Sequence, residues 1–167
     1  MFIRLVLAIV VVILVGDHED SLSVREREST LAKALNSKDK GGILVLTARD
    51  FHVYFTCGSV VRSFSTNVSR RDWINDVSRL PRTSYKATAS KVRLLHAWRP
   101  GYELPGNSMA YVTVDEFWTI RLPQGGQVEL HFLAEDTWVK LQGTWKLTGR
   151  IYPPRPCADD PYWVSPQ

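Results

Sequence analysis

The chain of 167 residues has little of what metal sites and disulfide scaffolds require. It contains two cysteines, Cys57 and Cys157, which lie 100 positions apart, and no two of its four histidines stand at metal-ligand spacing. Zinc-type sites draw their ligands from closely spaced residues, so we expect no metal and no cofactor. In an oxidising compartment the two cysteines could pair; otherwise they are two unrelated small side chains.

The sequence also lacks the local motifs of several enzyme and binding classes. It has no G-x-S-x-G nucleophile motif, no phosphate-binding loop and no dinucleotide-binding glycine motif. The 21 basic residues are interleaved with 17 acidic ones, for a net charge of +4, and form no run. The densest group, Arg70 and Arg71 with Arg79 and Arg82, is interpreted as a solvated helix face. We therefore expect no nucleic-acid binding.

The amino terminus is the most apolar part of the chain. Arg4 precedes an unbroken apolar run at 5–15, and acidic residues begin at Asp17. This run is too short for a bilayer span, which needs roughly 20 residues. Residues 1–16 are typical of a secretory signal, so we expect export, either secreted or periplasmic. No A-x-A pattern precedes Asp17, which leaves two alternatives open, an uncleaved amino-terminal membrane anchor and a misassigned start.

Apolar spacing after this segment predicts helices first and strands later. Helical spacing appears at 21–36 and 43–46 and again after Ser69, which is expected to cap a helix that Pro81 stops. Alternation predicts strands at 51–56, 91–98, 109–122, 128–141 and 144–152. This order predicts one α+β domain over 17–152, a curved antiparallel sheet wrapped on the amino-terminal helices, followed by an irregular proline-rich tail at 153–167.

The same order resembles the nuclear transport factor 2-like superfamily, in particular its SnoaL-like or kinase-association-domain-like branch. The resemblance rests on LAKALNSKD at 31–39, TARDF at 47–51, RDW at 71–73, EDTWV at 135–139 and GTWKL at 143–147. It implies a cystatin-like cone with an apolar pocket at its wide end, often in homodimers. Members include isomerases, dehydratases, cyclases and pocket proteins without a known reaction.

The resemblance also indicates which positions of this chain correspond to the catalytic residues of ketosteroid isomerase-like members. In ketosteroid isomerase-like members a catalytic Asp lies near the end of the first strand, a position that corresponds to Phe55 here. The oxyanion Tyr of their first helix corresponds to Leu31. Both residues are apolar, so isomerase chemistry of that type is not expected. An acidic position on a later strand corresponds to Asp136.

Strand parity singles out two acids independently of any family. On 128–141, Asp136 shares a face with apolar residues, and on 109–122 Glu116 is the one charge on its apolar face. If Leu122 pairs with Val128, the two acids become diagonal neighbours within roughly 7 Å. If Leu141 pairs with Thr144, Gly149 lies opposite Asp136 and leaves open space above it.

Two readings of these acids remain open. As neighbours in an apolar site, Asp136 and Glu116 would be a catalytic acid/base pair with a raised pKa. Alternatively, Asp136 is tied to a backbone amide, to Arg150 or to Arg121 and only braces the sheet.

Three functions follow from these features. The leading hypothesis is an exported pocket protein that binds a small apolar ligand. We expect its pocket to be lined by Phe55, Trp73, His96, Trp118, Phe132 and Trp138. The second is a lyase or isomerase that uses Asp136 and Glu116, with His96 as a further candidate. The third is a dimerisation or partner-binding module that uses the outer sheet face, namely Tyr111, Thr113, Phe117, Thr119, His131 and Leu133.

Overall fold

The computed structural model describes the backbone of residues 2–59, 62–95 and 109–155, and the side chains of 18–54, 67–95 and 109–152. The elements along the chain are α1 (Phe2–Ser37), α2 (Lys40–Leu46), β1 (Thr47–Ser59), β2 (Arg62–Ser69), α3 (Arg70–Arg79), β3 (Arg82–Leu95), β4 (Met109–Arg121), β5 (Gln127–Leu141) and β6 (Thr144–Arg155). This order confirms the predicted α+β class. No helix among the described residues is long and apolar enough to cross a membrane.

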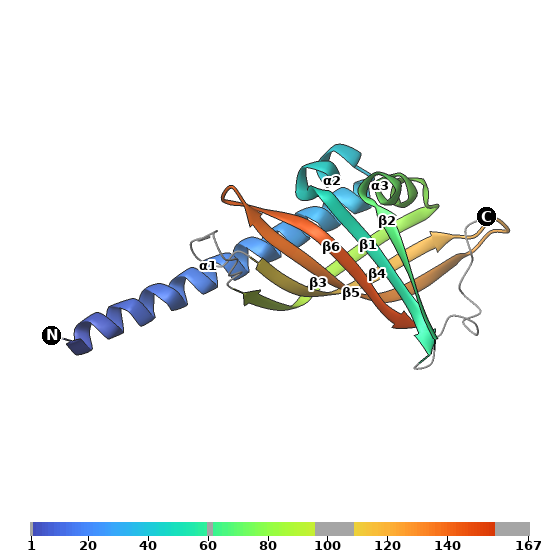
Figure 1. Cartoon of the computed structure of the whole chain (residues 1–167). Coiled ribbons are helices and arrows are strands. Elements are labelled where there is room, and N and C mark those ends of the chain that lie inside the picture. Colours follow the sequence, from blue (N-terminus) through green and yellow to red (C-terminus); the bar gives the residue numbers. More distant parts are fainter. Residues whose placement is uncertain (1, 60–61, 96–108, 156–167) are drawn as a thin grey trace.

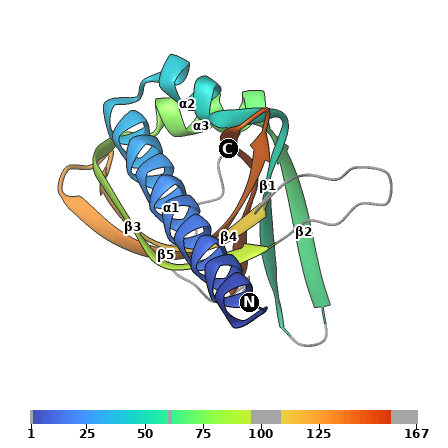
Figure 2. The same cartoon turned by 90° about the vertical axis from the view of Figure 1, so that its left-hand side faces the viewer.

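The strands form one curved sheet that wraps around α1. Its order is β2-β1-β6-β5-β4-β3, and every pair is antiparallel except β1 with β6. Helix α1 lies in the concave face, and α2 and α3 cover one end of the sheet (Figures 1 and 2). The amino-terminal part of α1 extends beyond the sheet (Figure 1).

Local signals explain where the elements begin and end. Ser69 caps α3, since its hydroxyl accepts from the Asp72 amide as predicted. The β5–β6 turn places Gln142 and Gly143 at positive φ, which gives the tight turn expected there. The predicted short helix at 43–46 is confirmed as α2, which begins at Lys40 because Asp39 accepts from the Gly42 amide.

Two strand predictions were incomplete. No strand was predicted between the one at 51–56 and the helix after Ser69, yet β2 pairs along β1 from His52–Ser69 to Ser59–Arg62. As an edge strand, β2 needs no alternating apolar pattern to form backbone hydrogen bonds. The strand expected at 91–98 starts much earlier, at Arg82. Two register shifts in the β3–β4 pair, one before Ser84 and one after Ala89, break the alternation that would have identified it.

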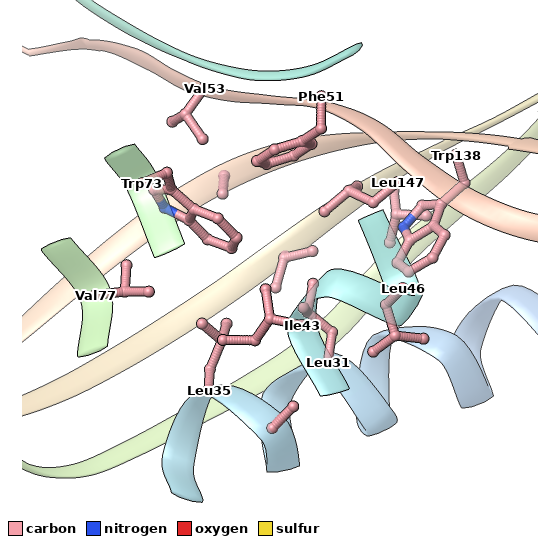
Figure 3. Packing of buried hydrophobic residues seen from close by; sticks show 14 of the residues in the cluster. Leu31, Leu35, Ile43, Leu46, Phe51, Val53, Trp73, Val77, Trp138 and Leu147 are labelled. Atoms are coloured by element: carbon pink, nitrogen blue, oxygen red, sulfur yellow. The ribbon is translucent and has the colours of Figure 1, made fainter. Parts of the chain in front are cut away.

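The apolar core lies between the helices and the concave face of the sheet. Figure 3 shows Phe51 of β1 facing Trp73 of α3, with ring centroids 5.0 Å apart. Leu31 and Leu35 of α1 join them in the same buried cluster. Since these residues come from α1, β1 and α3, burying them together holds α1 and α3 in the curve of the sheet.

Candidate functional site

A fully buried arginine joins the two acids that strand parity singled out. Arg150 on β6, Asp136 on β5 and Glu116 on β4 are each 0% exposed. Arg150 Nε and Nη2 donate to the two carboxylate oxygens of Asp136, at 2.6 and 2.5 Å. Its Nη1 donates to Glu116 Oε1 at 2.5 Å. The predicted placement of both acids on the inner face is therefore confirmed, and Arg150 forms an ion pair with each of them.

The remaining acceptor positions of Glu116 are occupied by aromatic side chains. The Tyr85 hydroxyl donates to Oε1 at 2.6 Å, and Oε2 accepts from the Tyr152 hydroxyl at 3.0 Å and from Trp118 Nε1 at 3.2 Å. Burial first, and the Glu116 charge second, raise the pKa of Tyr85 and of Tyr152 well above the ordinary value. Both phenols therefore stay neutral and act as donors.

Helix α1 contributes a third carboxyl group, that of Glu28, which is only 4% exposed. Trp138 Nε1 donates to Glu28 Oε1 at 2.5 Å. Burial, then the charge of Asp136, raise the pKa of Glu28 well above its ordinary value, against the lowering effect of Arg150. A hydrogen bond with Asp136 acts in the same direction as burial. The raised pKa favours the protonated form of Glu28, which can donate a hydrogen bond to Asp136.

A second buried arginine, Arg82 at the start of β3, lies beside this cluster and is 7% exposed. Its guanidinium lies 5.0 Å from the ring centroid of Trp118 and 5.3 Å from that of Tyr85. Its Nη2 donates to the Leu35 carbonyl at the end of α1. Its Nη1 finds no hydrogen-bond partner among the described residues. Burial lowers the pKa of Arg82, and the neighbouring Tyr85 and Glu116 oppose that effect.

The registers that place these groups differ from the predicted ones. Strands β4 and β5 pair Arg121 with Gln127, so Asp136 lies opposite Val112. The prediction that it lies opposite Val114, diagonal to Glu116, was wrong. Gly125 and Gly126 both take positive φ, and the Leu122 amide donates to the Gly126 carbonyl, so the turn closes one residue earlier on each strand than expected.

The expected open space above Asp136 is also absent. Leu141 does pair with Thr144, but a β-bulge between Thr137 and Trp138 shifts the register, so Arg150 and not Gly149 lies opposite Asp136. The guanidinium fills the space that a glycine would have left open. Of the alternatives left open for Asp136, the tie to Arg150 is the one observed.

The expected ligand-binding residues are distributed unevenly. Trp73, Trp118 and Trp138 are buried inside the cone, and Phe132 is half-buried and contacts Trp118 with ring centroids 6.1 Å apart. Only the backbone of Phe55 is described, and His96 lies outside the described residues, as does Cys157 of the expected cysteine pair. Among the residues whose side chains are described, no group of His, Cys, Asp or Glu could hold a metal ion.

A crevice opens beside Glu28, between α1 and the sheet. Its volume is about 250 Å³, and its walls come from α1, β3 and β4. The lining residues are Arg25, Glu28, Ser29, Ala87, Thr88, Ala89 and Val114. None of the four expected ligand-binding residues whose side chains are described lines it. Sequence reasoning missed Glu28, although Glu28 shares helical spacing with the buried Val24, Leu31 and Leu35.

Comparisons with known proteins identify the fold. No family model matches the chain. No curated protein matches it by sequence. Among solved structures, a conserved protein from Planctomyces limnophilus superposes with a TM-score of 0.61 at 16% identity, covering 80% of this chain and 94% of that one. A nuclear transport factor 2-like protein of unknown function from Shewanella baltica gives 0.57 at 12% identity, covering 81% and 93%.

A third similar structure carries the name of an enzyme. A candidate scytalone dehydratase from Novosphingobium aromaticivorans gives a TM-score of 0.59 at 14% identity, covering 81% of this chain and 84% of that one. The chain therefore has the nuclear transport factor 2-like fold, a cone formed by a curved sheet on helices. Proteins that share this fold include ones of unknown function and one named as a dehydratase.

Proposed function

We propose that this protein binds a small, mainly apolar molecule in the crevice between α1 and β3, and that its buried acids hold the cone in shape. The main support for this proposal is that Arg150 forms ion pairs with both Asp136 and Glu116, so that neither acid is left to act as a catalytic base. A general base must come within hydrogen-bond reach of the proton that it abstracts. Neither acid is exposed, and every carboxylate oxygen of the pair already accepts a hydrogen bond.

The crevice has the composition expected of a small ligand site. Ala87, Ala89 and Val114 supply apolar walls, and the neutral carboxyl group of Glu28 supplies a polar contact. Arg25 bridges the two sides, because its Nη1 donates to the Ala89 carbonyl at 2.5 Å. A volume of about 250 Å³ is just below the usual range of roughly 300–1,000 Å³ for ligand pockets, so the ligand should be small.

Small cyclic alcohols and phenols can test this proposal. Cyclohexanol, phenol and indole are titrated into the full chain, with binding followed by the shift in melting temperature and by NMR. Ala87→Leu fills the crevice and should abolish binding. Lys86→Leu places the same leucine side chain at an exposed neighbour and should leave binding unchanged. If no probe stabilises the wild type, or if Ala87→Leu binds as well as the wild type, the crevice is not the site.

A lyase-type reaction is the second candidate, and Glu28 is the observation that favours it. Its pKa is raised by burial and by Asp136, and it lines the crevice, so it can donate a proton to a departing hydroxyl group, which leaves as water. The Glu28 carboxylate that remains then takes up the α-proton of the substrate as the carbon–carbon double bond forms, which restores the acid. The similarity in fold to a protein named as a dehydratase agrees with this chemistry.

Dehydration of a 3-hydroxy ketone, followed by the absorbance of the resulting enone, would test the lyase candidate. Glu28→Gln should abolish turnover while phenol binding persists. Equal turnover in the variant and the wild type would exclude Glu28 as the donor.

Two further proposals concern assembly and location. Phe117 and Leu133 on the outer sheet face are 49% and 40% exposed, which supports a homodimer across that face. A monomeric mass by light scattering would refute it.

The apolar run at 5–15 supports export or anchoring through residues 1–16. Fractionation of cells that express the full chain, with mass spectrometry of the amino terminus, distinguishes cleavage from anchoring.

A further inference from the structure

A second hollow lies away from the crevice, where α2 and α3 meet β1. Its volume is about 530 Å³, and among the residues whose side chains are described none lines both this hollow and the crevice. Four basic side chains and no carboxylate of that part of the chain line it; the basic residues are Lys40, Arg49, Arg70 and Arg71. This concentration of one charge is unusual in a chain whose acids and bases are otherwise interleaved.

Two of these basic side chains lie where the local electrostatic potential disfavours a positive charge. Arg70 and Arg71 are the first two residues of α3, where the positive end of the helix dipole disfavours cations. Partial burial first, and the nearby charge of Arg49 second, lower the pKa of Arg70. Like charges gathered at a helix start are unfavourable without a counter-ion, so the arrangement favours an anionic occupant.

Two acids that neighbour these cations in sequence, Asp39 and Asp72, take part in helix caps. Asp39 caps α2 through the Gly42 amide. Asp72 takes part in the cap of α3, accepting from the Ser69 hydroxyl at 2.6 Å, and its contact with Arg71 is long, at 3.6 Å, and exposed. Arg49 is exposed and has no ion pair with any residue in the described parts of the chain.

The guanidinium of Arg70 is already used in hydrogen bonds within the fold. Its Nε donates to Thr47 Oγ1 at 2.8 Å and its Nη2 donates to the Leu44 carbonyl, so it ties α3 to α2 and β1. Lys40 Nζ lies 3.1 Å from Asn75 Oδ1, which links α2 to α3 across the hollow. Arg70 and Lys40 thus shape the hollow, and Arg49 and Arg71 are available to a ligand.

The hollow also has apolar lining. Leu44, Phe51 and Ile74 contribute to it, and Leu44 is 45% exposed. A simple inorganic ion would leave this apolar surface uncovered, whereas an anion with an apolar body would cover it. Arginine side chains bind carboxylate and phosphate groups through paired hydrogen bonds.

We propose that this hollow is a second binding site, which takes a small organic anion whose carboxylate or phosphate group meets Arg49 and Arg71 and whose apolar part covers the exposed side chain of Leu44. It is independent of the crevice, so either site can exist without the other.

Isothermal titration of the full chain with four probes tests the proposal. Phenyl phosphate and benzoate carry both the charge and the apolar ring, benzyl alcohol lacks the charge, and inorganic phosphate lacks the ring. We expect binding of the first two, weaker binding of inorganic phosphate and none of benzyl alcohol. Added potassium chloride should weaken binding, because the contacts are exposed ion pairs.

Two variants and one control locate the site. Arg49→Gln and Arg71→Gln should each weaken phenyl phosphate binding by about tenfold, as expected for loss of a charged hydrogen bond. Both residues are exposed, so the variants should keep the melting temperature of the wild type. Arg79→Gln, exposed at the far end of α3, should bind as the wild type does. Failure of both organic anions to bind, equal binding of benzyl alcohol, or unchanged affinity in Arg49→Gln and Arg71→Gln would overturn the proposal.

Discussion

Arg150 lies directly opposite Asp136 across the β5–β6 pair, and a β-bulge between Thr137 and Trp138 sets this register. The pairing that begins at Leu141 and Thr144 would otherwise place Gly149 at that position. Because of the bulge, Asp136 forms a buried ion pair with Arg150 and does not lie beside open space. The four predictions below test how far the fold depends on this pair and on the groups around it.

Removal of the central guanidinium should destabilise the protein strongly. Arg150→Met leaves Asp136 and Glu116 buried without their cation, and breaking a buried ion pair in this way costs about 3–5 kcal/mol. Urea unfolding at neutral pH measures the loss. Arg121→Met, an exposed arginine at the end of β4, should change stability by less than about 0.5 kcal/mol. A triple variant that adds Asp136→Asn and Glu116→Gln should recover part of the loss; equal costs for the two arginine variants would contradict the ion-pair role.

Replacement of Glu28 should alter the dependence of stability on pH. The folded-state pKa of Glu28 is raised above its ordinary value, mainly by burial. The stability contributed by its neutral form is therefore fully present below the unfolded-state pKa and is lost as the pH rises through the folded-state pKa. Glutamine cannot ionise, so Glu28→Gln should gain stability relative to the wild type as the pH rises. Urea unfolding between about pH 5 and about pH 8 measures this difference.

The control for that series is Glu26→Gln, an exposed position on the same helix that also removes one carboxylate. Parallel stability curves for Glu28→Gln and the wild type across this range would show that Glu28 ionises without penalty in the folded protein.

The hydroxyl of Tyr85 should contribute measurably to the free energy of unfolding. It donates to the buried Glu116 carboxylate at 2.6 Å, and such a bond contributes about 1.5–3 kcal/mol. Tyr85→Phe should lose about that much in chemical denaturation. Tyr111→Phe, on the outer face of β4 beside Arg93, should lose less than about 0.5 kcal/mol. A cost for Tyr85→Phe no larger than that of Tyr111→Phe would mean that Glu116 does not need this donor.

Two glycines should respond to alanine with opposite signs. Gly143 has φ of +77° in the β5–β6 turn, so Gly143→Ala should destabilise by about 1–2 kcal/mol. Gly41 lies in α2, where an added Cβ would meet only Asp39 Oδ1, at 3.4 Å. Gly41→Ala should therefore stabilise by about 0.4–1 kcal/mol. Thermal unfolding measures both, and a change of the same sign in the two variants would contradict the turn geometry.

Sequence reasoning predicted the parts of this fold that depend on local patterns. Alternation along β4 and β5 placed Glu116 and Asp136 on the inner face, and Ser69 was recognised as the cap of α3. These features are encoded within a few neighbouring residues. The α+β order followed from the sequence of helical and alternating segments, and the cone was implied by the resemblance to the nuclear transport factor 2-like superfamily.

The rest of the site depends on register, which local patterns do not contain. The bulge after Thr137 and the β4–β5 turn, which lies one residue earlier than expected, each change the register between neighbouring strands, and both changed which residue meets Asp136. Tyr85 could not be found because the register shifts near Ser84 and Ala89 interrupt the alternation of β3. Glu28 carried a usable signal, a single acid on the buried stripe of α1, but its partner Trp138 lies 110 positions away.

The parallel pairing of β1 with β6 sets the order in which the sheet can be completed. β6, at residues 144–155, is the strand that joins the β2–β1 pair to the β5–β4–β3 meander. During synthesis on the ribosome, β1 therefore emerges long before the strand that will bind its inner edge. Contacts between such distant segments slow folding and leave strand edges open to aggregation in the meantime. A nascent chain shortened before residue 144 should be recognised by chaperones, and release of the complete chain should coincide with docking of its last strand.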